Sequence, residues 1–241
     1  MVNNEHTSKQ FDSELDAVRE RVLQMGGLVE SQIQRAIEAL INRDEGLMER
    51  VVADDHRVNA LEVEIDENCN HIIVCRQPTA GDLRMVMTVV KTITDLERIG
   101  DEAKNIARMA QRLSKKEQIH GMPRYSEIRH AAKLVQDMLH RSLDAFARLD
   151  PTAVAHIVRQ DEQVDQEYIA ILRHLITFMM EDPRTISTAF EILFVAKAIE
   201  RIGDHAKNMS EYVVYMVKGR DVRHVSVEEI EREVGSSDQT K

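Results

Sequence analysis

Apolar residues recur at alternating steps of three and four along most of the chain. In a first segment, from about residue 8 to 42, they run from Phe11 to Leu40, and a segment from about 80 to 114 carries a similar stripe. Steps of three and four place apolar side chains on one face of an α-helix. The pattern therefore predicts long amphipathic helices that pack against one another through these faces.

Short breaks divide this pattern into six long helices. Asp44 is expected to cap the second helix, which ends before Pro78, because proline disfavours helix at the residue that precedes it. Thr79 can then cap the third helix, and Asp150-Pro151 has the residue types of a new helix start. The later helices are expected at about 125–149, from 151 to a break at 181–183, and at about 185–218.

The two halves of the chain are copies of one another. Residues 97–105 read Glu-Arg-Ile-Gly-Asp-Glu-Ala-Lys-Asn, and residues 200–208 repeat this segment with eight of the nine residues unchanged. Upstream, positions between 39 and 58 recur in the same order between 145 and 164. Two unrelated amphipathic helices would share apolar positions, but would not share an internal Arg-Ile-Gly-Asp. The repeat therefore predicts an all-α fold of two tandem, pseudo-symmetric three-helix bundles.

The repeat also sets the expected domain boundaries. The first three-helix bundle is expected over residues 1–116 and the second over 124–220, with a polar linker between them. Residues 221–241 are expected to form a tail that frays toward its Gly- and Ser-containing end.

Composition favours helices and excludes several classes of protein. The 241 residues include only 9 Gly and 4 Pro, too few for the turns of a β-sandwich. With 42 acidic against 32 basic side chains, the formal net charge is −10, which disfavours binding to nucleic acid or to an anionic membrane. No apolar run approaches the length that spans a bilayer, and the first residues lack the features of a secretory leader. We therefore expect a soluble, cytoplasmic protein without direct membrane insertion.

Two repeated carboxylate pairs are the first candidates for chemistry. Glu97 and Asp101 lie four residues apart on one helix, and Glu200 and Asp204 repeat this arrangement in the second half. Side chains at i and i+4 are neighbours, and two like charges there cost roughly 0.2–0.5 kcal/mol. Both pairs continue an apolar stripe, so they take positions where contact with another helix is expected.

A second helix in each half also places polar residues among apolar ones. Asp55 with Asn59, and Asp161 with Asp165, lie in phase with neighbouring apolar positions. Antiparallel packing would gather the pairs of each half into a cluster of oxygen atoms, which would repel one another unless a cation bound there. All-oxygen ligands favour a hard divalent or trivalent cation, for which Mg²⁺, Mn²⁺, Ca²⁺, iron and zinc are candidates.

Two other interpretations of these acids stay open at this point. The acids can lie on a solvated face and form ordinary ion pairs with the adjacent Lys104 and Lys207, in a purely structural bundle. They can instead serve a metalloenzyme, which would need a titratable group beside its metal. The repeat does not supply a His in both halves, since His205 stands where the first half has Glu102. The sequence also lacks a nucleotide-binding glycine loop and a nucleophile elbow, so we expect no catalysis.

Three segments together resemble the PhoU family of accessory regulators of bacterial phosphate-specific transport. They are the repeated Glu-Arg-Ile-Gly-Asp, the break at residues 76–84, and Met25-Gly26-Gly27. The resemblance covers nearly the whole chain and implies two pseudo-symmetric three-helix bundles in each subunit of a homodimer. It also implies metal clusters at acidic motifs, which here correspond to Glu97 with Asp101, Glu200 with Asp204, and Asp161 with Asp165. Asn59 replaces a carboxylate of the motif, so the first-half site is expected to bind metal more weakly.

The resemblance further implies a regulatory role that the residues themselves do not show. The family exerts negative control over the phosphate-starvation response and phosphate uptake, without catalysis of its own. Its expected partners are the ATPase subunit of the phosphate transporter and a phosphate-sensing histidine kinase. Such partners would hold the protein at the cytoplasmic face of the inner membrane.

Overall fold

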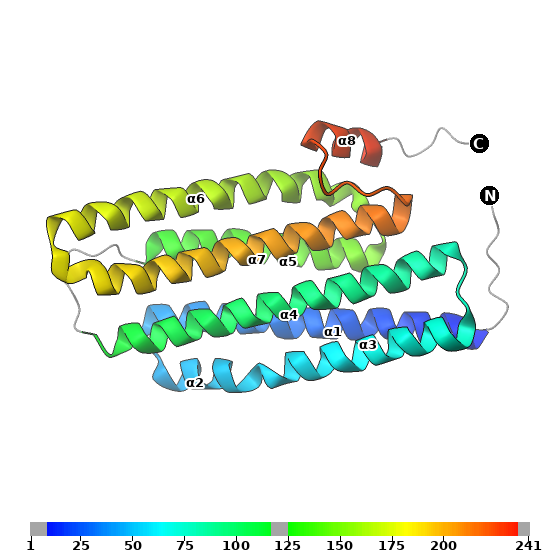
Figure 1. The fold of residues 1–241 in the computed structure, drawn as a ribbon, viewed down its shortest axis with the longest axis horizontal. Helices are drawn as coiled ribbons and strands as arrows, with labels where there is room; N and C mark the ends of the chain where they lie inside the picture. The colour runs from blue at the N-terminus through cyan, green and yellow to red at the C-terminus, as the bar shows by residue number, and fades with distance from the viewer. Residues whose placement is uncertain (1–8, 117–124, 236–241) are drawn as a thin grey trace.

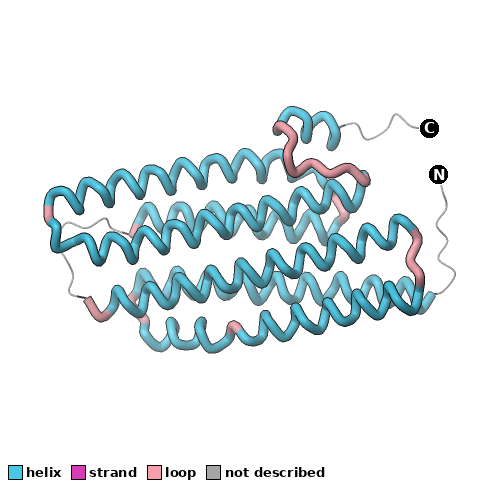
Figure 2. Tube along the Cα trace, in the orientation of Figure 1, coloured by secondary structure: helices cyan, strands magenta, loops and turns pink. Residues whose placement is uncertain are grey.

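The computed structural model describes residues 9–116 and 125–235, and all regular elements in these ranges are helical (Figure 2). The α-helices are α1 (Lys9–Asn42), α2 (Glu45–Asp54), α3 (His56–Arg76), α4 (Ala80–Ser114), α5 (Ser126–Arg148), α6 (Val154–Glu181), α7 (Ile186–Lys218) and α8 (Val227–Gly235). Two short 3-10 helices, η1 (Pro151–Ala153) and η2 (Pro183–Thr185), lead into α6 and α7. The predicted all-α fold is confirmed.

The helices form two bundles that lie side by side (Figure 1). The first bundle contains α1, the α2–α3 pair and α4, and the second contains α5, α6 and α7. Helices α4 and α7 run along each other and form the main contact between the bundles, which α1 and α5 extend. The two repeated segments of the sequence therefore lie on the two helices that join the bundles.

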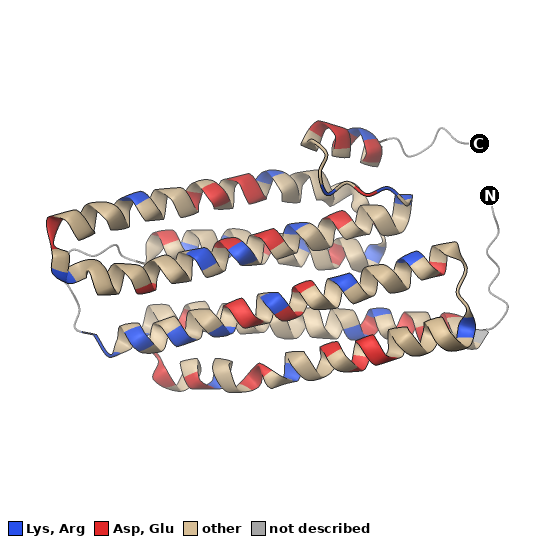
Figure 3. Cartoon of the chain, viewed as in Figure 1, with Lys and Arg blue, Asp and Glu red and all other residues tan. Residues whose placement is uncertain are grey.

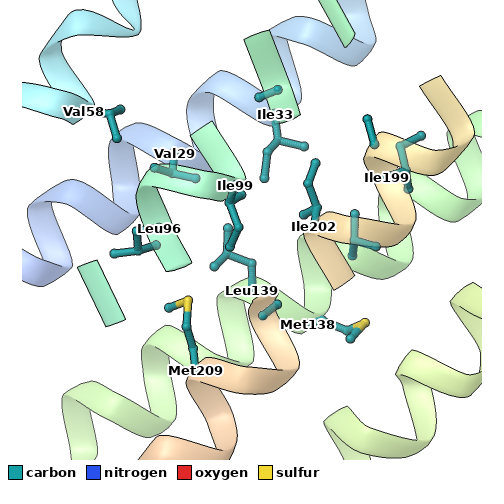
Figure 4. Close-up of a cluster of buried hydrophobic side chains, with 14 of the residues drawn as sticks. Val29, Ile33, Val58, Leu96, Ile99, Met138, Leu139, Ile199, Ile202 and Met209 are labelled. Atoms are coloured by element: carbon teal, nitrogen blue, oxygen red, sulfur yellow. The ribbon is translucent and has the colours of Figure 1, made fainter. Parts of the chain in front are cut away.

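The apolar stripes meet in one core that is continuous across the two bundles. Ile33 and Ile99 of the first bundle and Leu139 and Ile202 of the second belong to the same buried cluster (Figure 4). All four side chains are fully shielded from solvent. Because each half presents apolar residues to the other, the bundles stabilise one another by the hydrophobic effect.

Aspartate caps begin several of the helices, as the sequence predicts. The Asp44 carboxylate accepts a hydrogen bond from the Leu47 backbone N–H (2.9 Å), and Asp150 accepts one from Thr152 (3.0 Å). Pro151 follows Asp150 at the first position of η1. Thr79 precedes α4, but its hydroxyl donates to the Asp82 carboxylate (2.6 Å) and forms no side-chain cap bond to the helix backbone.

The structure differs from the prediction in the second helix, which is divided at Asp55 into α2 and α3. The Asp55 carbonyl accepts hydrogen bonds from the backbone N–H groups of both Val58 (3.0 Å) and Asn59 (3.3 Å). Its carboxylate forms no cap bond to α3, because it is held by side chains of α1 and α4 instead. The interruption therefore coincides with the polar cluster described below.

Part of the expected tail also forms a helix. Ile230 and Val234 of α8 are buried in a small apolar cluster with Val154 of α6 and Val214 of α7. Helix α8 has only nine residues, so its two buried side chains give too short a pattern to reveal it in the sequence. The linker residues 117–124 and the end of the tail, residues 236–241, lie outside the described residues.

Candidate functional site

The first acidic cluster forms where the start of α3 faces the middle of α4. Lys104 Nζ lies 2.6 Å from Asp55 Oδ2 and 2.6 Å from Asp101 Oδ1, so one ammonium group joins carboxylates of two helices. Asp55 is buried, whereas Asp101 is half-buried at the edge of the cluster. Figure 3 shows the alternation of acidic and basic residues along α4 that this arrangement uses. The structure thus brings the predicted acids of the two helices together around a lysine.

A buried glutamine from α1 completes the inner side of this cluster. Gln32 Nε2 donates to Asp55 Oδ1 (3.1 Å), while Gln32 Oε1 is buried without a hydrogen-bond partner. A Cβ atom on Gly100 would lie 3.3 Å from Gln32 Oε1 and 3.8 Å from Asp55 Oδ1, so both oxygens face the glycine of the repeated motif. Sequence reasoning missed Gln32, although a polar residue within the apolar face of the first helix was a visible signal.

Glu97 lies at the outer side of the same cluster. Burial raises the pKa of Glu97, and the nearby charges of Asp101 and Glu62 raise it further. Burial also raises the pKa of Glu62, with a contribution from Asp66. Glu62 is a second acid that sequence reasoning missed, and its signal is its place seven residues after Asp55, about two helical turns along the predicted second helix.

Asn59 contributes less than the other predicted residues. Its side chain is exposed, and the hydrogen bond that the structure gives it runs from its backbone N–H to the Asp55 carbonyl (3.3 Å). The first cluster therefore consists mainly of Asp55, Asp101 and Glu97, with Glu62 and Gln32 in addition.

The second acidic cluster lies between α6 and α7 and repeats the pairing of a lysine with a buried aspartate. Lys207 Nζ donates to the carboxylate of the buried Asp161. Burial raises the pKa of Asp161, although the Lys207 ammonium opposes that shift. Burial likewise raises the pKa of Asp204, and the charges of Glu200 and Asp161 add to it. The exposed Asp165 contributes a smaller repulsion to both groups.

A second lysine accompanies this cluster. Lys197 Nζ lies 2.5 Å from the Glu200 carboxylate and 5.4 Å from the centre of the Tyr168 ring. Tyr168 occupies the position that Glu62 has in the first half. Compared with the first cluster, the second therefore has the ring of Tyr168 in place of the Glu62 carboxylate. It also has an additional cation, Lys197, paired with Glu200.

The inner sides of the two clusters also differ. A Cβ atom on Gly203 would lie 3.3 Å from Val135 Cγ1 and 3.6 Å from Asp161 Oδ1. Val135 thus takes the place that Gln32 has beside Gly100, and it cannot donate a hydrogen bond to Asp161. The polar donor to the buried aspartate is present in one half and absent at the equivalent position of the other.

The donor chemistry of the clusters suits a hard cation, but lysine already occupies them. Carboxylate and amide oxygens are the ligands that Mg²⁺, Mn²⁺ and Ca²⁺ prefer. Among residues 9–116 and 125–235, no three or more His, Cys, Asp or Glu side chains are grouped in a way that could hold a metal ion. Carboxylate oxygens of Asp55 and Asp101 instead contact Lys104, and one of Asp161 contacts Lys207. The clusters therefore have oxygen atoms of the kind that a hard cation binds, but a lysine ammonium group already contacts some of these oxygens.

The repeated segments differ only at Glu102 and His205, and both residues form side-chain pairs at the contact between α4 and α7, which we call the seam between the bundles. His205 Nδ1 lies 2.7 Å from Asp95 Oδ1, and Glu102, its counterpart in the first half, lies 2.7 Å from Arg201 Nη1. Both pairs join α4 to α7, and Asp95 is buried. His205 is thus paired with a residue of the other bundle.

The surface is charged over most of its length. Figure 3 shows acidic and basic residues on every long helix of the bundles. Within the described residues, no helix combines the length and the apolar character that a membrane span requires.

A family model described as the PhoU domain matches this chain at residues 22–110 and 128–213. These two segments correspond to the two halves of the repeat, one in each bundle. The sequence evidence for an internal duplication and the family match therefore agree.

Individual relatives match over nearly their whole length. The phosphate-specific transport system accessory protein PhoU of Escherichia coli K12 is 48% identical over 238 residues, which cover 99% of this chain and 98% of that protein. A PhoU homolog of Pseudomonas aeruginosa with the same description is 46% identical over 230 residues, covering 95% of this chain and 94% of that protein.

Solved structures share the fold. The crystal structure of PhoU from Pseudomonas aeruginosa matches with a TM-score of 0.84 at 45% identity, covering 87% of this chain and 100% of that one. The phosphate transport system regulatory protein PhoU from Streptococcus pneumoniae matches with a TM-score of 0.80 at 29% identity, covering 88% of this chain and 99% of that one.

Proposed function

Because the chain belongs to the PhoU domain family, we propose that it is an accessory protein of a phosphate-specific transport system. The observation that carries this proposal is the match of relatives with that description over almost the full length of both chains. The shared fold of two joined helical bundles supports it. A shared fold alone does not define a role. These relatives, however, are 46% and 48% identical to this chain over nearly its whole length, so we expect a common role.

Within that system, we propose that the protein is a non-enzymatic negative regulator of phosphate uptake and of the phosphate-starvation response. It acts as an adaptor between the ATPase subunit of the transporter and the phosphate-sensing histidine kinase. The description of the Streptococcus pneumoniae relative as a regulatory protein supports this role. The pairing of the buried acids with lysines also favours a binding protein, since a catalytic acid or base needs access to a substrate.

The surface offers features suited to protein partners on the cytoplasmic side of the inner membrane. Phe190 and Phe194 are about half exposed on α7, with their ring centres 6.4 Å apart. Exposed aromatic side chains are enriched at protein interfaces. The net charge of −10 favours basic surfaces on the partners, and association should weaken as salt rises. We propose a homodimer as the working form.

We also propose that the two acidic clusters take a divalent or trivalent cation. Asp55, Glu97 and Asp101, with Asn59 nearby, would hold it in the first half. Asp161, Asp165, Glu200 and Asp204 would hold it in the second. A bound cation would supply positive charge that joins α3 to α4 and α6 to α7. It would also offset the carboxylate repulsion that adds to burial in raising the pKa values of Glu97 and Asp204. Mg²⁺, Mn²⁺, iron and zinc are the candidates.

Copurification tests the adaptor role. A tagged full-length chain should retain the transporter ATPase subunit and the histidine kinase from detergent-solubilised membranes, and retention should decline in high salt. An unrelated acidic helical protein with the same tag is the matched control. Recovery of neither partner above that control, at low salt and in both phosphate-rich and phosphate-poor cells, would count against the adaptor role.

A further inference from the structure

Lys104 and Lys207 occupy equivalent positions of the repeat and share one contact. Each is the eighth residue of its repeated segment, three residues after the second acid. Each ammonium group contacts the buried aspartate of the neighbouring helix, Asp55 in one half and Asp161 in the other. The duplication has therefore preserved the cation together with the acids.

Each lysine side chain brings an ammonium group into its cluster on a flexible four-carbon stem. The Lys104 ammonium lies between the carboxylates of Asp55 and Asp101, and the Lys207 ammonium contacts the carboxylate of Asp161. Each cluster therefore already contains a cation of the protein itself.

We infer that Lys104 and Lys207 are resident cations of the two acidic clusters and compete with metal ions for the same carboxylate oxygens. This inference rests on the proposed cation binding and adds what controls it. A metal ion at the first cluster needs Asp55 and Asp101, whose oxygen atoms each lie 2.6 Å from Lys104 Nζ. Two positive groups cannot share these oxygens without strong repulsion, so a metal ion binds only when the lysine side chain leaves.

The first cluster contains a further oxygen that a cation can use. Gln32 is 1% exposed, and its Oε1 atom is buried without a hydrogen-bond partner beside Gly100 and the Asp55 carboxylate. A buried unpaired acceptor is costly, and an incoming cation would relieve that cost. Val135 supplies no oxygen at the equivalent place in the second half, so the oxygen of Gln32 distinguishes the first cluster from the second.

The inference predicts that removing the lysine charge strengthens metal binding. Lys104→Met and Lys207→Met keep much of the side-chain volume and remove the ammonium group. Mn²⁺ is titrated into each metal-free full-length protein, and free Mn²⁺ is measured by electron paramagnetic resonance. Each variant should bind Mn²⁺ at least about tenfold more tightly than the unmodified chain at its altered cluster. Mn²⁺ should also raise the melting temperature of these variants more than that of the unmodified chain.

Two control variants separate charge from other effects. Lys116→Met removes a lysine that pairs with Glu191 away from both clusters, and it should leave Mn²⁺ binding unchanged. Lys104→Arg keeps the positive charge and should bind Mn²⁺ as weakly as the unmodified chain. Tight binding by Lys104→Arg would overturn the inference, because it would show that charge does not exclude the metal.

The remaining outcomes are also decisive. If the unmodified chain binds Mn²⁺ and the two Met variants bind it no more tightly, the clusters take cations but the lysines do not compete. If none of the proteins binds Mn²⁺, the proposed cation binding fails together with the inference. Should Lys104→Met not fold in metal-free buffer, refolding on addition of Mn²⁺ supports the inference, and failure of Mn²⁺ to restore folding contradicts it.

Discussion

Glu211 provides a quantitative test of how burial controls charge on α7. Its side chain is 5% exposed, and burial raises its pKa from 4.5 to about 7, although the charge of Lys207 opposes that shift. Because the pKa is higher in the folded state, the folded protein holds a proton on Glu211 that the unfolded chain has already released. The contribution of this protonation to the unfolding free energy is fully present below the pKa that Glu211 has in the unfolded chain. It is lost as pH rises through the pKa that Glu211 has in the folded protein.

The size of the effect follows from the two pKa values. Their difference, from 4.5 to about 7, corresponds to about 3 kcal/mol of unfolding free energy. Glu211→Gln keeps the shape of the side chain and removes its titration. The substitution should therefore remove this part of the pH dependence, and the variant should gain stability relative to the unmodified chain as pH rises.

Urea unfolding followed by circular dichroism measures this difference. The unfolding free energies of the unmodified chain and Glu211→Gln are determined at several pH values that bracket both pKa values. Their difference should change by about 3 kcal/mol across the series. Glu229→Gln, at an exposed position of α8, is the matched control and should leave the pH profile unchanged. Parallel profiles for the unmodified chain and Glu211→Gln would refute the reasoning.

Three further substitutions test the seam, the close helix contact and a helix cap, each by urea unfolding. Asp95→Ala removes the buried partner of His205 and should lower the unfolding free energy by about 3 kcal/mol; a loss under about 1 kcal/mol would show that the pair adds little. Gly203→Val adds bulk where a Cβ lies 3.3 Å from a buried valine and should cost about 2 kcal/mol, whereas Gly27→Ala, with open space around it, should not destabilise. Asp150→Ala should cost about 1 kcal/mol through the lost cap, and an unchanged stability would contradict that role.

The helices and the duplication could be predicted because each signal lies within a single segment. The apolar stripe of α4 depends only on the spacing of its own residues, and caps such as Asp44 act on the next few residues. The pairing of Glu97 with Asp101 follows from helix geometry alone. These features are local, so no knowledge of the tertiary structure was needed.

Contacts between helices could not be predicted in the same way. The bond from Lys104 to Asp55 depends on the register of α3 against α4, which the close approach at Gly100 permits. The sequence left open whether Lys104 forms a surface ion pair with these acids, and the structure places it between Asp101 and the buried Asp55. His205 and Asp95 are 110 residues apart, and only the packing of the bundles brings them together.

Deletion of the gene, with expression of phosphate-starvation genes as the readout, is the most direct test of the proposed regulatory role. These genes should be switched on in phosphate-rich medium when the protein is absent, and the full-length chain supplied in trans should restore repression. A chain truncated after α4 is the matched control, because it lacks the second bundle and the seam that stabilises the first. Normal repression in a clean deletion strain would contradict the proposed role as a negative regulator.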